Sequence, residues 1–279
     1  MMKFGIYSNV TRDLDGNAGI KLANFLVKNN IEFALCADLS ISNLPYVYYS
    51  NEDLAQNCDI VIVLGGDGTV LHYGKICAKY NTPIFAVNVG RVGFLSECDT
   101  TSMFDNILKI INGKYFLEKR NLLKVDLGIK HYYALNDCII TRDVHNSLIE
   151  LDYYVNDTWV THIRGDALVI ATPTGSTAYS LSGGGPIVAP DVKGILITPI
   201  CPYTLFSRPL IVGQDNIITV KIKPNCIGYI NIDGEDILNL KGGEIINVSK
   251  ADVKLDFVRM TTSSFYTKIS KKNKTMEME

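Results

Sequence analysis

The chain has 279 residues, of which 47% are hydrophobic and 20% charged, and its formal net charge is −2. These values are ordinary for a globular protein of one large or two smaller domains, and they give no reason to expect nucleic acid or an anionic membrane as a partner. The apolar runs are far shorter than the roughly 20 residues that cross a bilayer. The start, MMKFGIYSNV, does not resemble a signal peptide, so we expect a cytoplasmic protein.

Cysteine and histidine spacing argues against a metal centre made of these residues. The seven cysteines are odd in number and include no C-x-x-C pair, so we expect reduced, mostly buried thiols. The four histidines include no H-x-x-x-H pair, so we expect no zinc site.

Residues 1–115 alternate between strand and helix patterns. Short apolar runs predict strands at KFGIY, IEFAL, DIVIVL and TPIFAVNVG. The segments between and after them have the apolar spacing of amphipathic helices, namely DGNAGIKLANFLVKNN, TVLHYGKICAKY and TSMFDNILKIINGK. This alternation predicts an α/β domain with a parallel, doubly wound sheet.

The pattern changes near Phe116 to short runs rich in β-branched and aromatic residues, from LLKVDLGI through to VKLDFVR. Asn156-Asp157 separates two of these runs and predicts a hairpin turn. We therefore expect an all-β, antiparallel, sandwich-like domain over 116–260. Residues 261–279 are expected to form a last helical turn and a solvated tail.

The pentapeptide GGDGT lies between a predicted buried strand and a predicted helix. Because glycine lacks a Cβ, the backbone at Gly65, Gly66 and Gly68 can turn sharply and approach a ligand. Thr69 stands where we expect the helix to begin, so free N–H groups there would attract an anion such as phosphate. Asp67 would repel phosphate, which predicts that it meets a metal ion or accepts a proton. The alternative is a simple strand-to-helix turn capped by Thr69.

Two further stretches carry candidate ligand groups. NVGRVGFLS, residues 88–96, follows the next predicted strand, and ligands of doubly wound sheets bind beyond the carboxyl ends of strands, so it should lie near the GGDGT loop. Phe94 in it can stack on a base or plug a domain interface. Asn136 and Asp137 are polar residues in an otherwise apolar predicted strand, suited to ribose hydroxyls or a base edge, unless backbone groups satisfy them.

The longest polar stretch is RGDALVIATPTGSTAYSLSGGGPIVAP, residues 164–190. Arg164 and Asp166 precede a predicted buried strand, and hydroxyls and glycines follow it on a pliable backbone suited to wrapping a polar ligand. A disordered linker is the alternative, but Tyr179 and Leu181 within the stretch favour docking against the protein.

In this order, GGDGT, NVGRVGFLS, ALND, the 164–190 stretch, ITPICPYTLFSRPLIV and IDGE resemble the NAD kinase family over nearly the whole chain. GGDGT alone also occurs in lipid kinases of the diacylglycerol kinase type, whereas TPTGSTAYSLSGGGP and the PICP…SRP stretch are typical of NAD kinases. The resemblance implies an α/β domain followed by a β-sandwich domain. It also implies phosphoryl transfer to the 2′-hydroxyl of the adenosine ribose of NAD, giving NADP. The donor would be ATP, another nucleoside triphosphate or polyphosphate, used with a divalent metal, Mg or Mn.

The same resemblance assigns roles to residues. Asp67 would accept the proton of that hydroxyl, or position the hydroxyl and the metal, with Asp233 as a supporting acid, and no metal ligand is certain. Asp166 would lie near the nicotinamide end and reach it from a neighbouring subunit, which implies a homotetramer or homodimer. Many family members have Glu where Asp137 stands and Arg or Lys where His72 stands. The phosphate loop would comprise Gly65, Gly66 and Thr69, and NAD would be bound by Gly68, His72, Phe94, Asn136, Asp137, Arg164, Asp166, Thr174, Thr177, Ala178, Tyr179, Ser180, Leu181, Ser182 and Asp233.

Two other functions fit parts of the sequence. A lipid kinase shares the GGDGT loop, but the 164–190 stretch offers little apolar surface for a lipid tail. A non-catalytic dinucleotide sensor would tolerate the loss of Asp67, and both the acid and its glycine loop are intact. NAD kinase activity is therefore the function that the sequence predicts.

Overall fold

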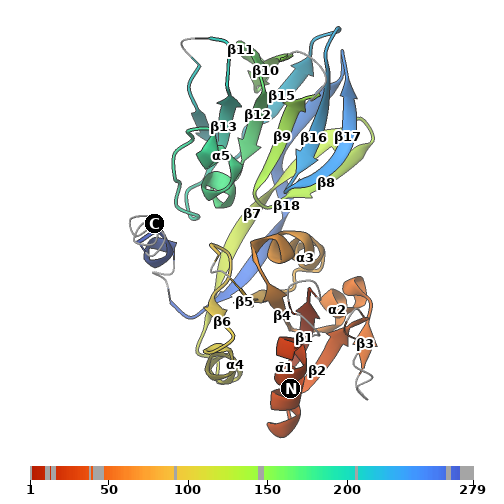
Figure 1. Cartoon of the computed structure of the whole chain (residues 1–279), viewed down its shortest axis with the longest axis vertical. Coiled ribbons are helices and arrows are strands. Elements are labelled where there is room, and N and C mark those ends of the chain that lie inside the picture. The colour runs from red at the N-terminus through yellow and green to blue at the C-terminus, as the bar shows by residue number, and fades with distance from the viewer. Residues whose placement is uncertain are drawn as a thin grey trace. The chain divides into compact units, whose positions relative to one another are not determined.

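The computed structural model describes residues 2–9, 13, 17–37, 39, 47–90, 93–143, 148–204, 207–261 and 265–270. The chain forms two compact units, shown in Figure 1: unit 1 comprises Met1–Lys119 and Val253–Glu279, and unit 2 comprises Arg120–Asp252. The β-rich unit therefore differs in its bounds from the expected 116–260. The chain returns to unit 1 before residue 260 because Phe257 pairs with Ile84 in the sheet of that unit. Residues 91–92 of the NVGRVGFLS stretch, and 262–264 and 271–279 of the expected tail, lie outside the described residues.

Unit 1 has the predicted parallel, doubly wound sheet. Its strands run in the order β5-β4-β1-β2-β3, and β6 pairs in parallel with β5. Every residue of β4 is buried, as expected for a strand covered on both faces. The strands are β1 Lys3–Ser8, β2 Glu32–Cys36, β3 Tyr48–Tyr49, β4 Ile60–Gly65, β5 Ile84–Asn88 and β6 Cys98–Asp99, and the helices are α1 Asn17–Lys28, α2 Asn51–Asn57, α3 Asp67–Tyr80 and α4 Met103–Ile111.

Aromatic side chains link the helices of unit 1 in two pairs, α3 with α2 and α1 with α4. The Tyr73 ring of α3 stacks on Tyr7 of β1 with centroids 3.9 Å apart, and its hydroxyl donates to the Asn51 carbonyl at the start of α2. The rings of Phe25 in α1 and Phe104 in α4 lie 4.7 Å apart. Figure 1 shows the two pairs on opposite faces of the sheet. Helix α2 and strand β3 are short and were not predicted from the sequence.

Unit 2 consists mainly of antiparallel strands, as predicted. Sheet neighbours are β14-β13-β12-β9-β16-β17 in one sheet, and β11-β10-β15-β18 with the β7–β8 pair in the other. Apolar side chains from both sheets form one core, which includes Val125, Leu151, Ile170 and Ile230. The strands are β7 Phe116–Leu127, β8 Lys130–Ala134, β9 Asp137–Arg142, β10 Ile149–Val155, β11 Thr158–Gly165, β12 Ala167–Ala171, β13 Gly194–Ile200, β14 Leu210–Gly213, β15 Ile218–Ile222, β16 Ile227–Ile232, β17 Glu235–Lys241 and β18 Ile245–Arg259.

The predicted turn at Asn156-Asp157 is confirmed. The two residues join β10 to β11 with φ values of 49° and 64°, the left-handed pair that a tight hairpin turn requires. Asparagine and aspartate tolerate this conformation better than other side chains, which explains why this dipeptide signals the turn.

Three local predictions differ from the structure. Helix α3 begins at Asp67 with Gly66 as its cap, and Thr69 is instead a buried residue of the first turn, its hydroxyl bonded by Asn9. Asn136 lies between β8 and β9 rather than inside a strand, and Asp137 is the first residue of β9. The segment after β12 forms two short helices, the 3-10 helix η3 Thr174–Thr177 and α5 Tyr179–Ser182.

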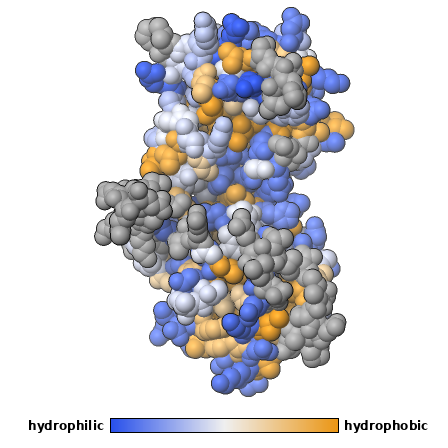
Figure 2. All heavy atoms as spheres, viewed as in Figure 1, coloured by the Kyte–Doolittle hydropathy of each residue, from blue (hydrophilic) through white to orange (hydrophobic). Residues whose placement is uncertain are grey.

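On the face drawn in Figure 2, hydrophobic and hydrophilic residues are interspersed over the surface. Among the helices that the structure describes, none is long and apolar enough to cross a membrane. All seven cysteines are free thiols, as predicted.

Candidate functional site

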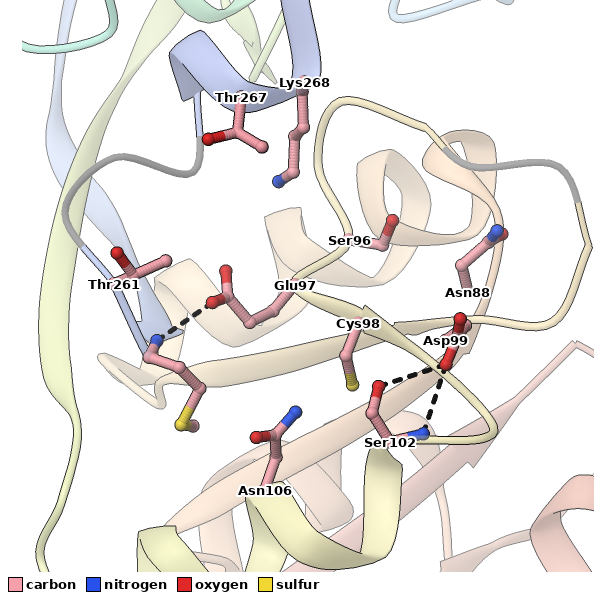
Figure 3. A pocket seen from close by; sticks show the side chains of 11 residues that line it. Asn88, Ser96, Glu97, Cys98, Asp99, Ser102, Asn106, Thr261, Thr267 and Lys268 are labelled. Carbon is pink, nitrogen blue, oxygen red and sulfur yellow. Dashed lines mark hydrogen bonds between the residues drawn. The ribbon is translucent and has the colours of Figure 1, made fainter. Parts of the chain in front are cut away.

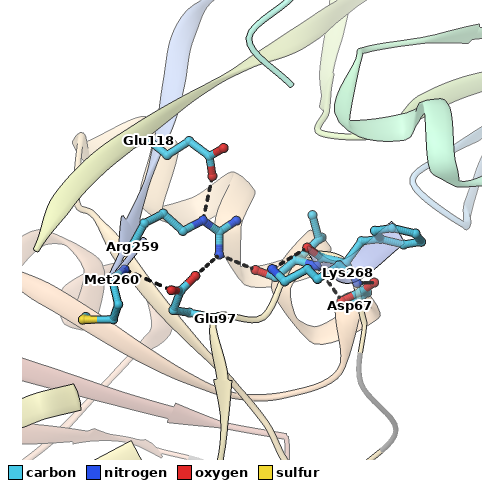
Figure 4. A network of polar contacts seen from close by, with 8 residues as sticks. Asp67, Glu97, Glu118, Arg259, Met260 and Lys268 are labelled. Atoms are coloured by element: carbon cyan, nitrogen blue, oxygen red, sulfur yellow. Dashed lines mark hydrogen bonds and ion pairs between the residues drawn. The ribbon is translucent and has the colours of Figure 1, made fainter. Parts of the chain in front are cut away.

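The Asp67 carboxylate is held by two main-chain N–H groups in unit 1. Phe94 donates to Oδ2 at 2.8 Å and Leu95 donates to Oδ1 at 3.1 Å, as part of the network in Figure 4. The predicted closeness of the GGDGT loop and the NVGRVGFLS stretch is therefore confirmed. The cause is the parallel pairing of β4 with β5, which sets Gly65 opposite Asn88 and brings both following loops to the same sheet edge.

Gly93 permits this arrangement. A Cβ built on Gly93 would lie 2.0 Å from Oδ1 of Asp67, so any other residue would displace the carboxylate or the loop. The glycine that this close contact requires therefore lies outside GGDGT, in the loop whose N–H groups bind Asp67.

The other GGDGT residues surround the start of α3. Gly66 and Gly68 have open space where a Cβ would be, so the first turn of the helix is accessible to a ligand at these positions. Thr69 is buried, whereas His72 is exposed on the next turn. The first turn has no side-chain cap, which leaves its N–H groups oriented as in anion-binding helix termini.

Arg259 supports the loop that holds Asp67. The Arg259 side chain is 1% exposed, and its Nη1 donates to the Leu95 carbonyl at 3.0 Å (Figure 4). Glu118 and Glu97 bind the same guanidinium at 2.6 and 3.2 Å. Two carboxylates thus compensate the buried cation, as burial of a charge requires.

A cavity of about 360 Å³ lies beside this loop, with Asn88, Ser96, Glu97, Asp99 and Lys268 among the residues that line it (Figure 3). Asp67 is not one of its lining residues.

In unit 2, Asp233 fixes the turn between β8 and β9. Its carboxylate accepts the N–H groups of Leu135 and Asn136, both at 2.8 Å, and of Asp137 at 3.2 Å. Asp233 itself has φ 52°, a left-handed conformation at the end of β16. Its carboxylate therefore organises the ALND turn through the main chain.

Asp137 is buried next to Asp233. Its side chain is 3% exposed, and burial, followed by the charge of Asp233, raises its pKa to about 7. The N–H of Tyr179 donates to the Asp137 carboxylate and partly offsets this rise in pKa. A carboxyl group that titrates near neutral pH is uncommon outside functional sites.

The start of the TPTGSTAYSLS segment is joined to the same turn. Thr172 donates its N–H to the Asn136 carbonyl at 2.8 Å and its hydroxyl to the Leu135 carbonyl at 2.6 Å. Gly175 packs so closely that a Cβ there would lie 2.2 Å from the Asn136 oxygen. Asn136, Asp137, Asp233 and the two short helices thus form one assembly.

The predicted ligand-binding residues of this segment fall into two groups. Thr174 and Ser180 are buried, and their hydroxyls bond Arg120 at 3.0 Å and Thr198 at 2.8 Å, so they stabilise the segment from within. The remaining residues are partly or fully accessible, with Tyr179 43% and Leu181 41% exposed, and this group comprises Thr177, Ala178, Tyr179, Leu181 and Ser182.

Arg164 and Asp166 contact other partners. Arg164, in β11, pairs with Glu150 at 3.4 Å, and Asp166, between β11 and β12, pairs with Arg142 at 2.7 Å. Both side chains are well exposed, at 50% and 40%. Neither has a contact with the Asn136–Asp137 turn among the described hydrogen bonds and ion pairs.

Several residues that hold these sites were not predicted from the sequence, including Arg120, Thr172 and Arg259. Arg120 lies in the charged stretch EKRN, and Arg259 follows the apolar pair Phe257-Val258. A sequence pattern suggests exposure at both positions, yet they are 4% and 1% exposed. Their role follows from partners far away in the chain, which no local pattern signals.

Comparison with protein families decides the classification. Residues 28–115 match the sequence model of the ATP-NAD kinase N-terminal domain, and residues 135–260 match that of the ATP-NAD kinase C-terminal domain. The chain belongs to the ATP-NAD kinase family. The resemblance carried by GGDGT, ALND and TPTGSTAYSLSGGGP is therefore confirmed.

Alignments with similar proteins cover nearly the whole length of this chain. It is 39% identical over 274 residues to an NAD kinase of a Thermoanaerobacter species, covering 95% of this chain and 96% of the relative. It is 34% identical over 273 residues to an NAD kinase of Caldicellulosiruptor saccharolyticus, covering 98% and 100%.

Two solved structures share the fold. Yeast NADH kinase complexed with NADH has a TM-score of 0.88 at 27% identity, covering 97% of this chain and 86% of the yeast chain. An NAD kinase from Archaeoglobus fulgidus in complex with ATP has a TM-score of 0.77 at 23% identity, covering 97% and 98%, and supports the fold alone.

The raised pKa of Asp137 predicts a pH dependence of stability. Unfolded Asp137 has a pKa near 3.8 and folded Asp137 one near 7, so between these values the folded state binds a proton that the unfolded state has lost. The contribution of Asp137 to the free energy of unfolding is therefore most favourable below about pH 4, where the group is protonated in both states. It falls as the pH rises to about 7. Asparagine does not ionise, so Asp137→Asn removes this loss of unfolding free energy. We expect the loss to be about 2–4 kcal/mol, which corresponds to several degrees in Tm.

Thermal unfolding of both proteins at pH 5 and pH 8 checks this expectation. The Tm of the Asp137→Asn variant should exceed that of the unmodified chain by more at pH 8 than at pH 5. An equal difference in Tm at both pH values would show that Asp137 is already ionised at pH 5 in the folded protein, which contradicts a raised pKa.

Proposed function

We propose that this chain is an NAD kinase that transfers the γ-phosphoryl group of ATP, or of a similar donor, to the 2′-hydroxyl of the adenosine ribose of NAD, giving NADP. The observation that carries the proposal is the placement of Asp67 in a member of the ATP-NAD kinase family. The acid occupies the first turn of a helix after a buried parallel strand, and two main-chain N–H groups fix its orientation.

Asp67 is suited to accept the proton of the attacking hydroxyl. Each carboxylate oxygen accepts one N–H bond, and a carboxylate has about four acceptor positions, so acceptor capacity remains for a hydroxyl. A base contributes to the rate only where it lies within hydrogen-bond reach of the proton, which requires a fixed orientation. The N–H groups at the start of α3 would bind donor phosphate oxygens, so that one helix end supplies both positioning and charge stabilisation.

A divalent metal, Mg or Mn, fits this chain as a companion of the donor. The described residues contain no group of three or more His, Cys, Asp or Glu side chains able to hold a metal ion. Mg²⁺ is commonly bound by one or two carboxylates together with substrate phosphates, and Asp67 is the acid available for this at the GGDGT loop. Such an ion would neutralise charge on the phosphate oxygens.

We assign dinucleotide binding in unit 2 to the assembly around the ALND turn. Asn136, Asp137 and the exposed ring of Tyr179 offer an amide, an acid and an aromatic face for ribose and base. Asp233 acts on this assembly by holding three N–H groups of the turn. We therefore assign it an orienting role in place of the expected support of Asp67.

The subunit arrangement is a second part of the proposal. The resemblance to NAD kinases assigns Asp166 to a neighbour's site, and the Asp166 side chain is 40% exposed beside Arg142. We infer a homotetramer or homodimer with two-fold symmetry, working in the cytoplasm, where the free cysteines would stay reduced.

Incubation of the chain with NAD, ATP and magnesium tests the activity directly. We expect NADP to form and neither diacylglycerol nor sphingosine to be phosphorylated, because the accessible residues around the ALND turn are mostly polar. Lipid phosphorylation without NADP would favour the lipid kinase alternative. NAD binding without any phosphoryl transfer would favour the sensor.

Replacement of Asp67 by Asn separates chemistry from binding. The variant keeps the size of the side chain but cannot accept the proton, so we expect kcat to fall about 10²–10⁴-fold, equivalent to roughly 3–5 kcal/mol, while NAD still binds. Gly93→Ala should also lower kcat, because its Cβ would displace the carboxylate. Gly90→Ala is the matched control, since a Cβ there meets no atom within 4 Å. Near-normal turnover of Asp67→Asn would rule out Asp67 as the base.

Sedimentation at assay concentrations tests the assembly. We expect the active species to be a dimer or tetramer, and dilution below the dissociation constant of the oligomer should remove activity together with the oligomer. A monomer with full activity would refute the assignment of Asp166 to a neighbouring subunit.

A further inference from the structure

The peptide group between Phe94 and Leu95 connects the candidate base to a cation. Its N–H, from Leu95, donates to Asp67 Oδ1 at 3.1 Å, and its carbonyl oxygen, from Phe94, accepts from Lys268 Nζ at 3.0 Å. Figure 4 shows Lys268 and Asp67 at this part of the network. The ammonium, the peptide and the carboxylate therefore form one chain of hydrogen bonds inside unit 1.

Such a chain has a defined electrostatic effect. A cation bonded to a carbonyl oxygen draws electron density from the peptide and makes its N–H a stronger donor, since consecutive hydrogen bonds polarise one another. It also restrains rotation of the peptide plane, which sets the direction of the N–H toward Asp67. Lys268 is partly buried, so solvent screens its charge less than that of a surface lysine.

The neighbouring peptide group is held in a comparable way. The Leu95 carbonyl accepts from Arg259, whose guanidinium is buried and bound by Glu97 and Glu118. Both residues that donate N–H groups to Asp67 thus have a carbonyl bonded to a cation. Arg259 is a core residue of unit 1, whereas Lys268 approaches from the short helix at 265–270 and lines the cavity of Figure 3.

We propose that Lys268 is a positioning residue for the phosphoryl transfer, acting on Asp67 through the Phe94–Leu95 peptide. The inference rests on the proposed function of Asp67 as the base. A lysine that only anchored the 265–270 helix would affect stability and leave the kinetic constants in place. A lysine that acted mainly on the Phe94 side chain would change the KM for NAD. The proposed role predicts a loss in kcat.

Kinetic constants of Lys268→Met and Lys268→Arg test the role. Methionine keeps much of the length without the charge, so we expect kcat to fall about tenfold with the KM values for NAD and ATP within about twofold, given that misplacement by 1 Å can cost about 10²-fold. Arginine restores a donor and a charge, and should return kcat to within about threefold of the unmodified chain. Tyr266→Ala is the matched control on the same helix, because Tyr266 is 64% exposed, and it should leave kcat unchanged.

A double-variant cycle with Asp67→Asn shows whether the effect passes through the acid. If Lys268 acts through Asp67, Lys268→Met should cause no further loss of kcat once Asp67 is Asn. The same tenfold loss in both backgrounds would overturn the proposal, as would a change confined to KM or to Tm. Absence of NADP formation by the unmodified chain would instead overturn the proposed function, and this inference with it.

Discussion

The hydrogen bonds from Phe94 and Leu95 to the Asp67 carboxylate impose the main constraint on unit 1. A carboxylate on the first turn of α3 keeps one orientation only if donors reach it from another loop. The parallel pairing of β4 and β5 supplies that loop at the same sheet edge. Gly93 then follows as a necessity, because the loop passes so close to the acid that no Cβ fits. The cations on the Phe94 and Leu95 carbonyls complete the arrangement by fixing the peptides that donate.

In unit 2, too, a carboxylate accepts hydrogen bonds from main-chain N–H groups, but here it shapes a turn. Asp233 gathers the N–H groups of Leu135, Asn136 and Asp137 and so shapes the turn between β8 and β9. The consequence is a second acid, Asp137, buried beside it, with a pKa raised by that burial and by the charge of Asp233. Two adjacent carboxylates cost stability when both are ionised. A substrate that donates a hydrogen bond to Asp137 would relieve part of that cost, which is a physical reason for placing ligand binding at this turn.

Much of both units follows from local sequence patterns. The spacing and length of the apolar runs predict β4, α3 and α4. The change from helical spacing to short runs of β-branched residues predicts the β-rich unit. Parallel strand topology predicts that the GGDGT loop and the NVGRVGFLS stretch meet. Contacts between residues far apart in the chain could not be predicted from the sequence. Arg259 bonds Leu95 across 164 positions and Lys268 bonds Phe94 across 174, so neither contact leaves a local signal. Strand β17 gives a weak local signal because its sequence, EDILNLK, mixes charged and apolar residues without a clear alternation. Thr69 was misplaced because glycine, with no side-chain signal, takes the cap.

The charges of the network in Figure 4 bear on how the donor binds. Asp67, Glu97 and Glu118 contribute three carboxylates, against the two cations Arg259 and Lys268. Both cations are already bonded to carbonyls or carboxylates, so the network has a formal excess of negative charge. A triphosphate brings several more negative charges to the neighbouring helix end, and the N–H groups of one helix carry only about half a positive charge. This charge imbalance supports our proposal that a divalent cation arrives with the donor.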